Sequence, residues 1–158
     1  MEKKLFGNKG VVIHLTDRKY RDDPLAIIAE HLEASQNNPQ GLVYLSCGTS
    51  FEDLSDVDYL LLYCGDGGNG HHFFAARVQD KSVSSSDLFI PEDAATYSPE
   101  KWANVPERTW FLLSDLRLFV SPESLTQITV TDREINFLDR IKIKERLSSC
   151  YANGALFL

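Results

Sequence analysis

The residues best suited to chemistry lie in one glycine-rich stretch at positions 63–74, YCGDGGNGHHFF. Within it, Cys64 and His71 have the residue types of a nucleophile and its general base, because a histidine can remove the proton of a thiol. However, Cys64 ends a strongly apolar run, where a buried thiol usually packs as a small hydrophobic group with a raised pKa. We therefore expect a protein that is not an enzyme, with a Cys64/His71 hydrolase as a minor alternative.

The glycines of this stretch spell the G-x-G-x-x-G pattern of dinucleotide-binding loops at residues 65–70. Such a loop opens a helix whose N-terminus binds the phosphates, whereas residues 71–78, HHFFAARV, are typical of a strand. The two adjacent histidines would point to opposite sides of that strand, so they are poorly placed to hold one metal ion. We expect no cofactor and no metal, and we interpret residues 65–70 as the turn of a hairpin.

Aromatic side chains beside predicted loops indicate a different chemistry, the stacking of a nucleobase. The planar rings of Tyr20, Trp102 and Trp110 are suited to hold a flipped or single-stranded base. Core packing is the stronger interpretation for Trp110, whereas Trp102 is equally suited to a pocket wall and to a lid over the core. Polar groups for such a pocket would come from Arg108 and, at a possible rim, from Asn69 and His71.

The charge of the chain bears on its partners. The formal net charge is −7 and the pI is about 5.0, which argues against broad electrostatic binding to nucleic acid but leaves room for a pocket that reads one base. The densest basic segments, residues 18–21 and 140–146, are typical of ordinary solvated surfaces. An acidic surface also suits a basic partner protein.

Length and composition predict one domain over residues 1–158, because 158 residues with 43% hydrophobic content suffice for a sizeable core. The three cysteines are widely separated and lack C-x-x-C spacing, so we expect a reducing, cytoplasmic setting. No run approaches the roughly 18 apolar residues of a membrane span, so we expect no membrane partner.

The periodicity of the chain predicts short strands with few helices. A helix is expected from residue 22 to about residue 36, because an acidic cap and Pro24 precede apolar residues at helical spacing. A capped helical turn is expected at residues 98–102 and another short helix at 121–125, whereas 132–147 is ambiguous, with helix favoured over strand. Strands are expected at residues 10–15, 42–47, 57–64 and 73–78, with one or two more, interrupted at 114–115, within 108–120.

These elements give an α+β fold with a curved or closed antiparallel sheet and a few flanking helices. Four features mark this order of elements: Tyr63, the segment 76–78, Trp110 with Phe111, and the segment 122–125. The order with these features resembles the PUA-like β-barrel superfamily, in particular its EVE and ASCH branches. The resemblance spans residues 10–128.

The resemblance implies binding of RNA, or of a modified or flipped base in DNA, in a pocket between the first helix and the barrel. By position, it places Thr16, Asp17, Tyr20, Trp102 and Trp110 nearest to that pocket. It also makes Arg18, Lys19 and Arg21 candidates for phosphate contacts.

Two functions follow as hypotheses. The first is a non-catalytic reader that stacks a base of single-stranded or flipped-base nucleic acid on an aromatic-lined pocket. The alternative is an acidic interaction or assembly module that binds a basic partner protein, for example in a phage, immunity or secretion-associated system. The oligomeric state stays open.

Overall fold

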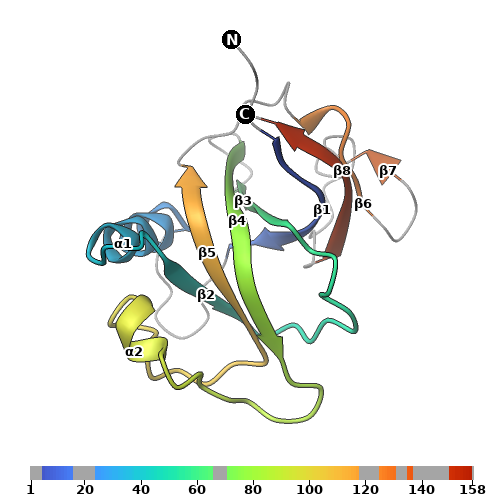
Figure 1. Ribbon diagram of the computed structural model, residues 1–158. Coiled ribbons are helices and arrows are strands. Elements are labelled where there is room, and N and C mark those ends of the chain that lie inside the picture. The colour runs from blue at the N-terminus through green and yellow to red at the C-terminus, as the bar shows by residue number, and fades with distance from the viewer. Residues whose placement is uncertain are drawn as a thin grey trace.

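A single mixed sheet forms the framework of the molecule. The computed structural model describes residues 5–15, 24–65, 71–117, 125–130, 135–136 and 150–157. The eight strands form one sheet in the order β2-β5-β4-β3-β1-β8-β6-β7 (Figure 1). The strands and helices are β1 (Leu5–His14), α1 (Pro24–Gln36), β2 (Val43–Cys47), β3 (Tyr59–Gly65), β4 (His71–Val83), α2 (Ala94–Tyr97), β5 (Thr109–Arg117), β6 (Thr129–Val130), β7 (Ile135–Asn136) and β8 (Cys150–Phe157).

The central hairpin confirms the expectation for the two strands that flank the glycine-rich stretch. β3 and β4 pair antiparallel, with Tyr59 opposite Arg77 at one end and Gly65 opposite His71 at the other. β3 is buried on both faces, because Leu60 belongs to one hydrophobic cluster while Leu61 belongs to another. This double burial explains why the strand is a continuous apolar run rather than an alternating one.

The antiparallel expectation is wrong at one position, the pairing of β1 with β3. These strands run parallel, from Gly10 opposite Tyr59 to His14 opposite Tyr63. Parallel neighbours need a long crossover connection, and here the chain between them contains α1 and β2. The sheet is therefore mixed, while the α+β class with flanking helices is confirmed.

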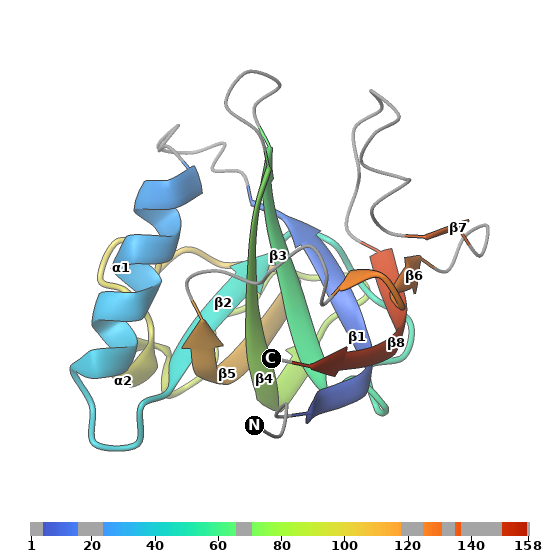
Figure 2. The ribbon, with the colours of Figure 1, turned by 90° about the horizontal axis from the view of Figure 1, so that it is seen from above.

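The sheet is curved, but within the described residues it is open, with β2 and β7 as its edges. Figure 2 shows β2 and α1 at one end of the sheet and β8, β6 and β7 at the other. The pairing of β4 with β5 shifts register between Ala75 and Arg77 and again between Val78 and Asp80. Such irregularities bend a strand, and they lie where β4 passes from its pairing with β3 to its pairing with β5.

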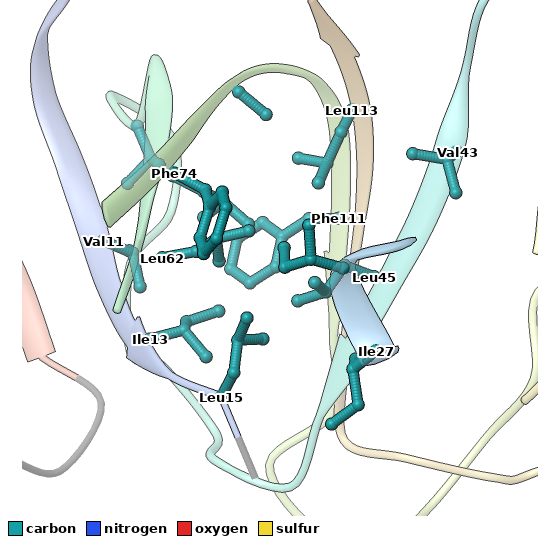
Figure 3. Close-up of a cluster of buried hydrophobic side chains, with 14 of the residues drawn as sticks. Val11, Ile13, Leu15, Ile27, Val43, Leu45, Leu62, Phe74, Phe111 and Leu113 are labelled. Carbon is teal, nitrogen blue, oxygen red and sulfur yellow. The ribbon is translucent and has the colours of Figure 1, made fainter. Parts of the chain in front are cut away.

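The largest hydrophobic cluster fills the inside of this curve. In Figure 3, Leu62 and Phe74 from the central hairpin face Phe111 from β5, and Ile27 from α1 closes the group at the side. Strands far apart in the sheet order thus meet through their side chains, which is how the curved sheet buries apolar surface without a second sheet.

Helix α1 covers Pro24–Gln36, which confirms the predicted helix over its described residues. Pro24 occupies its first position, and its C-terminal turn is closed by Asn38. The Asn38 side chain donates to the carbonyl oxygens of Ala34 and Leu42, at 3.2 and 2.7 Å, and accepts from the Leu42 amide at 3.0 Å. Gly41, at φ +67°, then reverses the chain into β2.

The predicted turn at 98–102 is confirmed, and a short helix that was not predicted precedes it. α2 covers Ala94–Tyr97, and the predicted turn at 98–102 follows it as a hydrogen-bonded turn in which the amides of Trp102 and Ala103 donate to the Pro99 carbonyl, at 3.0 and 3.1 Å. Within the segment 108–120, the described residues up to Arg117 contain one strand, β5. Its predicted interruption is a local kink, where Asp115 adopts φ 53° and pairs with Arg77 Nε at 3.0 Å.

The C-terminal part of the sheet differs most from expectation. Ile135 and Asn136, in the segment where helix was favoured, form strand β7 against β6, while 132–134 and 137–147 lie outside the described residues. β8, and the extension of β1 through residues 5–9, were not predicted because asparagine and glycine weaken the strand pattern there. Their mutual antiparallel pairing compensates for that weak local preference. Among the described residues, no helix is long and apolar enough to cross a membrane.

Gly10 is required where β1 meets β3, and its replacement tests this packing. A Cβ atom at Gly10 would overlap the buried ring of Tyr59, whose hydroxyl donates to the Gly154 carbonyl at 3.0 Å. We expect Gly10→Ala to lower the free energy of unfolding by about 1–3 kcal/mol. Gly48→Ala is the control, because its nearest atom, Glu107 Oε2, lies 3.5 Å away. Equal urea denaturation midpoints for both variants would contradict the expectation.

Candidate binding cleft

Several residues of the predicted pocket fall outside the described part of the chain. Thr16, Asp17, Tyr20 and Asn69 do so, as do the basic segments 18–21 and 140–146. His71 is the first residue of β4 and lies opposite Gly65, whereas Cys64 lies opposite His72. The register therefore does not pair Cys64 with His71.

Trp110 is a core residue and not a pocket wall. Its side chain is only 1% exposed, and its indole Nε1 donates to the Phe89 carbonyl at 2.9 Å. Its ring packs edge-on against Tyr44, with centroids 5.6 Å apart. Because its apolar surface is covered and its N–H is paired, Trp110 presents no face to a base, and its place among the predicted pocket residues is corrected here.

Tyr44, which packs against Trp110, also connects the start of α2 to the sheet. The Tyr44 hydroxyl donates to Asp93 Oδ1 at 2.7 Å, directly before α2 begins. Burial, followed by the hydrogen bond to Asp93, raises the pKa of Tyr44, so the hydroxyl keeps its proton. Phe89, whose carbonyl accepts from Trp110, also pairs with Glu107 through both backbone hydrogen bonds, at 2.9 and 3.1 Å. The segment before α2 is thus held by hydrogen bonds at two residues, Phe89 and Asp93.

Trp102 has a different environment, because it joins the segment after α2 to α1. Its half-buried ring stacks on His31, with centroids 5.2 Å apart and an interplanar angle of 29°. It also packs against the largest hydrophobic cluster, and Lys101 Nζ lies 5.6 Å from its ring centroid. Trp102 is therefore a lid over the core with part of its surface exposed. Arg108, by contrast, is half-buried beside Ser85, whose carbonyl lies 3.5 Å from its Nη1.

His31 supports this contact as a neutral ring. It is 5% exposed, and its Nδ1 lies 2.7 Å from the Ile27 carbonyl. A carbonyl only accepts, so Nδ1 carries the proton. Burial lowers the pKa of His31 to about 4, against which the hydrogen bond to Ile27 acts as the smaller effect.

These contacts leave a cleft between α1 and the segment 95–104, of about 760 Å³, which we call the α1–α2 cleft. Figure 1 shows α1 and α2 on the same side of the molecule, next to β2. One wall consists of Glu30, Glu33, Ala34 and Asn37, whose spacing places them on one face of α1. The polar groups of the other wall belong to Thr96, Ser98, Glu100, Lys101 and Asn104.

The charges of the cleft are unbalanced. Glu30, Glu33 and Glu100 supply carboxylates, and Lys101 supplies the one ammonium group among the lining residues that the structure describes. Among the residues that the structure describes, none forms an ion pair with these three glutamates. Glu30 Oε2 and Ser98 Oγ are enclosed and have no hydrogen-bond partner. The three carboxylates are suited to a positively charged ligand.

Sequence reasoning missed this cleft, although one signal for it was present. Glu30, Glu33 and Asn37 recur at the spacing of one helix face, beside the buried face that carries Ile27 and His31. A polar helix face is ordinarily solvated surface, so only the position of the facing segment makes it one side of a cleft.

Within the described ranges, no group of three histidine, cysteine, aspartate or glutamate side chains is placed to hold a metal ion. Comparison of the chain with models of protein families, with curated proteins and with solved structures found no match.

His31 provides a pH test of its burial as a neutral ring. Its pKa in the folded state, about 4, lies below the ordinary value of 6.5, so the unfolded chain binds the proton more readily. This contribution to stability is therefore present above pH 6.5 and is lost as the pH falls towards 4, by up to about 3 kcal/mol. Urea denaturation of the parent and of His31→Phe across this range should show a shallower decline for the variant. The same pH dependence in both proteins would contradict the assignment.

Proposed function

We propose that the protein is a non-catalytic interaction module that binds a basic segment of a partner protein in the α1–α2 cleft. The observation that carries the proposal is the excess of carboxylates in the cleft. Among the described residues, its charged lining consists of three glutamates and one lysine, and the glutamates form no ion pair there. A ligand with lysine or arginine side chains would supply the missing positive charge.

The size and walls of the cleft favour a short segment as the ligand. A volume of about 760 Å³ lies within the range of roughly 300–1,000 Å³ that is common for ligand pockets. It accommodates a few side chains but not a nucleic-acid duplex. The net charge of −7 acts in the same direction, because it attracts basic partners and repels polyanions at longer range.

The walls are also fixed before binding. Trp102 stacked on His31 connects the segment after α2 to α1, and Tyr44 bonded to Asp93 holds the start of α2. A preformed cleft loses little conformational freedom when a ligand enters, so more of the interaction energy contributes to affinity.

A nucleobase reader is the second candidate, and a specific observation favours it. Trp102 is half-buried, and its ring is held by the stack on His31, with Lys101 nearby as a cation for phosphate. A fixed, partly exposed ring is suited to stacking on a base. This candidate accords with the PUA-like resemblance, while the acidic α1–α2 cleft disfavours it.

Charge reversal in the cleft tests the first candidate. We expect Glu33→Lys combined with Glu100→Lys to weaken binding of a fluorescently labelled lysine-rich peptide by roughly tenfold or more, because both carboxylates lie in the proposed site. The matched control is Glu52→Lys with Asp56→Lys. These residues are exposed outside the cleft, and the pair changes the formal net charge of −7 by the same amount.

Fluorescence anisotropy at low and physiological salt measures the affinity of the parent and of both double variants for the labelled peptide. The parent and the control should bind with affinity that falls as salt rises. If both pairs weaken binding equally, only net charge matters and the cleft is not the site. A parent that binds no basic peptide at low salt rules out the proposal.

Tryptophan fluorescence tests the second candidate. The chain has two tryptophans, and Trp110 is buried, so quenching by an oligonucleotide should come from Trp102. We expect Trp102→Ala to weaken oligonucleotide binding by about 1–3 kcal/mol if a base stacks there. Circular dichroism checks that the variant folds. Unchanged affinity in a folded Trp102→Ala, or no binding by the parent to single-stranded or modified-base oligonucleotides, would rule out this candidate.

A further inference from the structure

A firmly held segment lies just before α2, with Phe89 at its centre. The Phe89 amide donates to the Glu107 carbonyl at 2.9 Å, and the Phe89 carbonyl accepts from the Glu107 amide at 3.1 Å and from Trp110 Nε1 at 2.9 Å. The ring of Phe89 packs against the cluster of Tyr44, Ala94 and Trp110. Three hydrogen bonds and a covered side chain therefore fix the backbone at this residue.

The residues on either side of Phe89 are exposed. Phe89 forms an antiparallel bridge with Glu107, and successive side chains of such an extended segment point to opposite faces. Leu88 and Ile90 thus point away from the cluster that covers Phe89, and they are 55% and 40% exposed. One exposed aliphatic side chain is ordinary, but two on one face of a fixed backbone form a preordered apolar surface. We call this pair the 88/90 patch.

Acidic residues flank the 88/90 patch on both sides. Asp87 directly precedes it, Glu92 and Asp93 follow it after Pro91, and all three acidic side chains are exposed. Within the described part of the chain, none of the three forms an ion pair. The surface is therefore complementary to a segment whose aliphatic side chains lie beside lysine or arginine, and it repels an apolar segment with acidic neighbours.

The 88/90 patch lies close to the α1–α2 cleft. Ile90 is five positions before Ala95, which lines the cleft, and even a fully extended chain of that length spans at most about 18 Å. Figure 1 shows the segment between β4 and α2 leading directly into the short helix. A partner segment of roughly six extended residues is therefore long enough to reach from the patch to the cleft.

We propose that the 88/90 patch binds aliphatic side chains of the same basic segment that enters the α1–α2 cleft. The inference rests on the proposed function and specifies the chemistry of the partner, in which leucine, isoleucine or valine lies near the lysine or arginine residues. The carboxylates of the cleft attract the segment, and this attraction weakens as salt rises. Burial of apolar surface against Leu88 and Ile90 then holds it, through contacts that salt does not screen.

The experiment uses three labelled peptides of equal length. The first contains lysines around a pair of leucines, the second has serines in place of the leucines, and the third keeps the leucines but has glutamates in place of the lysines. By fluorescence anisotropy, the parent should bind the lysine–leucine peptide at least severalfold more tightly than the lysine–serine peptide, and the glutamate–leucine peptide most weakly. Raising the salt should weaken both lysine peptides while the preference for leucine remains.

Serine substitutions locate the apolar contact. Leu88→Ser combined with Ile90→Ser should reduce the preference for the leucine peptide towards unity and leave the affinity for the lysine–serine peptide unchanged. Leu88→Ser alone should reduce the preference in part, and it keeps the test valid if the double variant fails to fold. The matched control is Leu25→Ser, which removes a leucine of similar exposure, 43%, on α1 and should keep the full preference. Circular dichroism shows whether each variant is folded.

The outcomes separate this inference from the proposed function. Equal affinity of the parent for the two lysine peptides overturns the 88/90 patch and leaves the interaction module standing. The same follows if the folded serine variants keep the full preference for leucine, or if the glutamate–leucine peptide binds as tightly as the lysine–leucine peptide. A preference for leucine that depends on Leu88, in a protein whose lysine-peptide affinity Glu33→Lys with Glu100→Lys does not change, overturns the cleft and supports the patch. No binding of any peptide by the parent overturns both.

Discussion

The parallel pairing of β1 with β3 is the constraint on which the rest of the structure depends. Two adjacent parallel strands cannot be joined by a tight turn, so the chain must leave the sheet and return in the same direction. Here the crossover contains α1 and then β2, which joins the sheet at its far edge beside β5. The helix is thereby placed at the β2 end of the sheet, where Ile27 closes the core within the curve and Glu30 and Glu33 face away from it.

The second wall of the cleft depends on aromatic packing rather than on regular secondary structure. α2 has four residues, which is too short to hold a position by itself. Its place is set instead by Trp110 bonded to the Phe89 carbonyl, by Tyr44 bonded to Asp93, and by Trp102 stacked on His31. The tryptophans thus have structural roles that bring Ser98 and Glu100 opposite the helix.

This arrangement gives α1 two distinct faces. One carries Ile27, Ile28 and His31 into the interior, and the adjacent one carries the glutamates of the cleft. Glutamates on an open helix surface would be fully hydrated and would have little consequence for binding. Facing a second acidic residue across a cleft, with one oxygen of Glu30 enclosed, they concentrate part of the chain's negative charge at one place. That concentration is what links the fold to the proposed recognition of a basic segment.

Local sequence determined those parts of the protein in which neighbouring residues interact. The helix with Pro24 at its start and the Asn38 turn at its end, the double burial of β3, and the β3–β4 hairpin all follow from residue spacing and turn chemistry. Only the tertiary structure decided that β1 runs parallel to β3, that β8 pairs with β1, and that Trp110 is buried. The physical reason is that these features depend on contacts between distant segments, whereas local periodicity reports only the spacing of neighbouring residues. The α1–α2 cleft belongs to the same class, because a glutamate on a helix has the same local pattern whether it faces water or another wall.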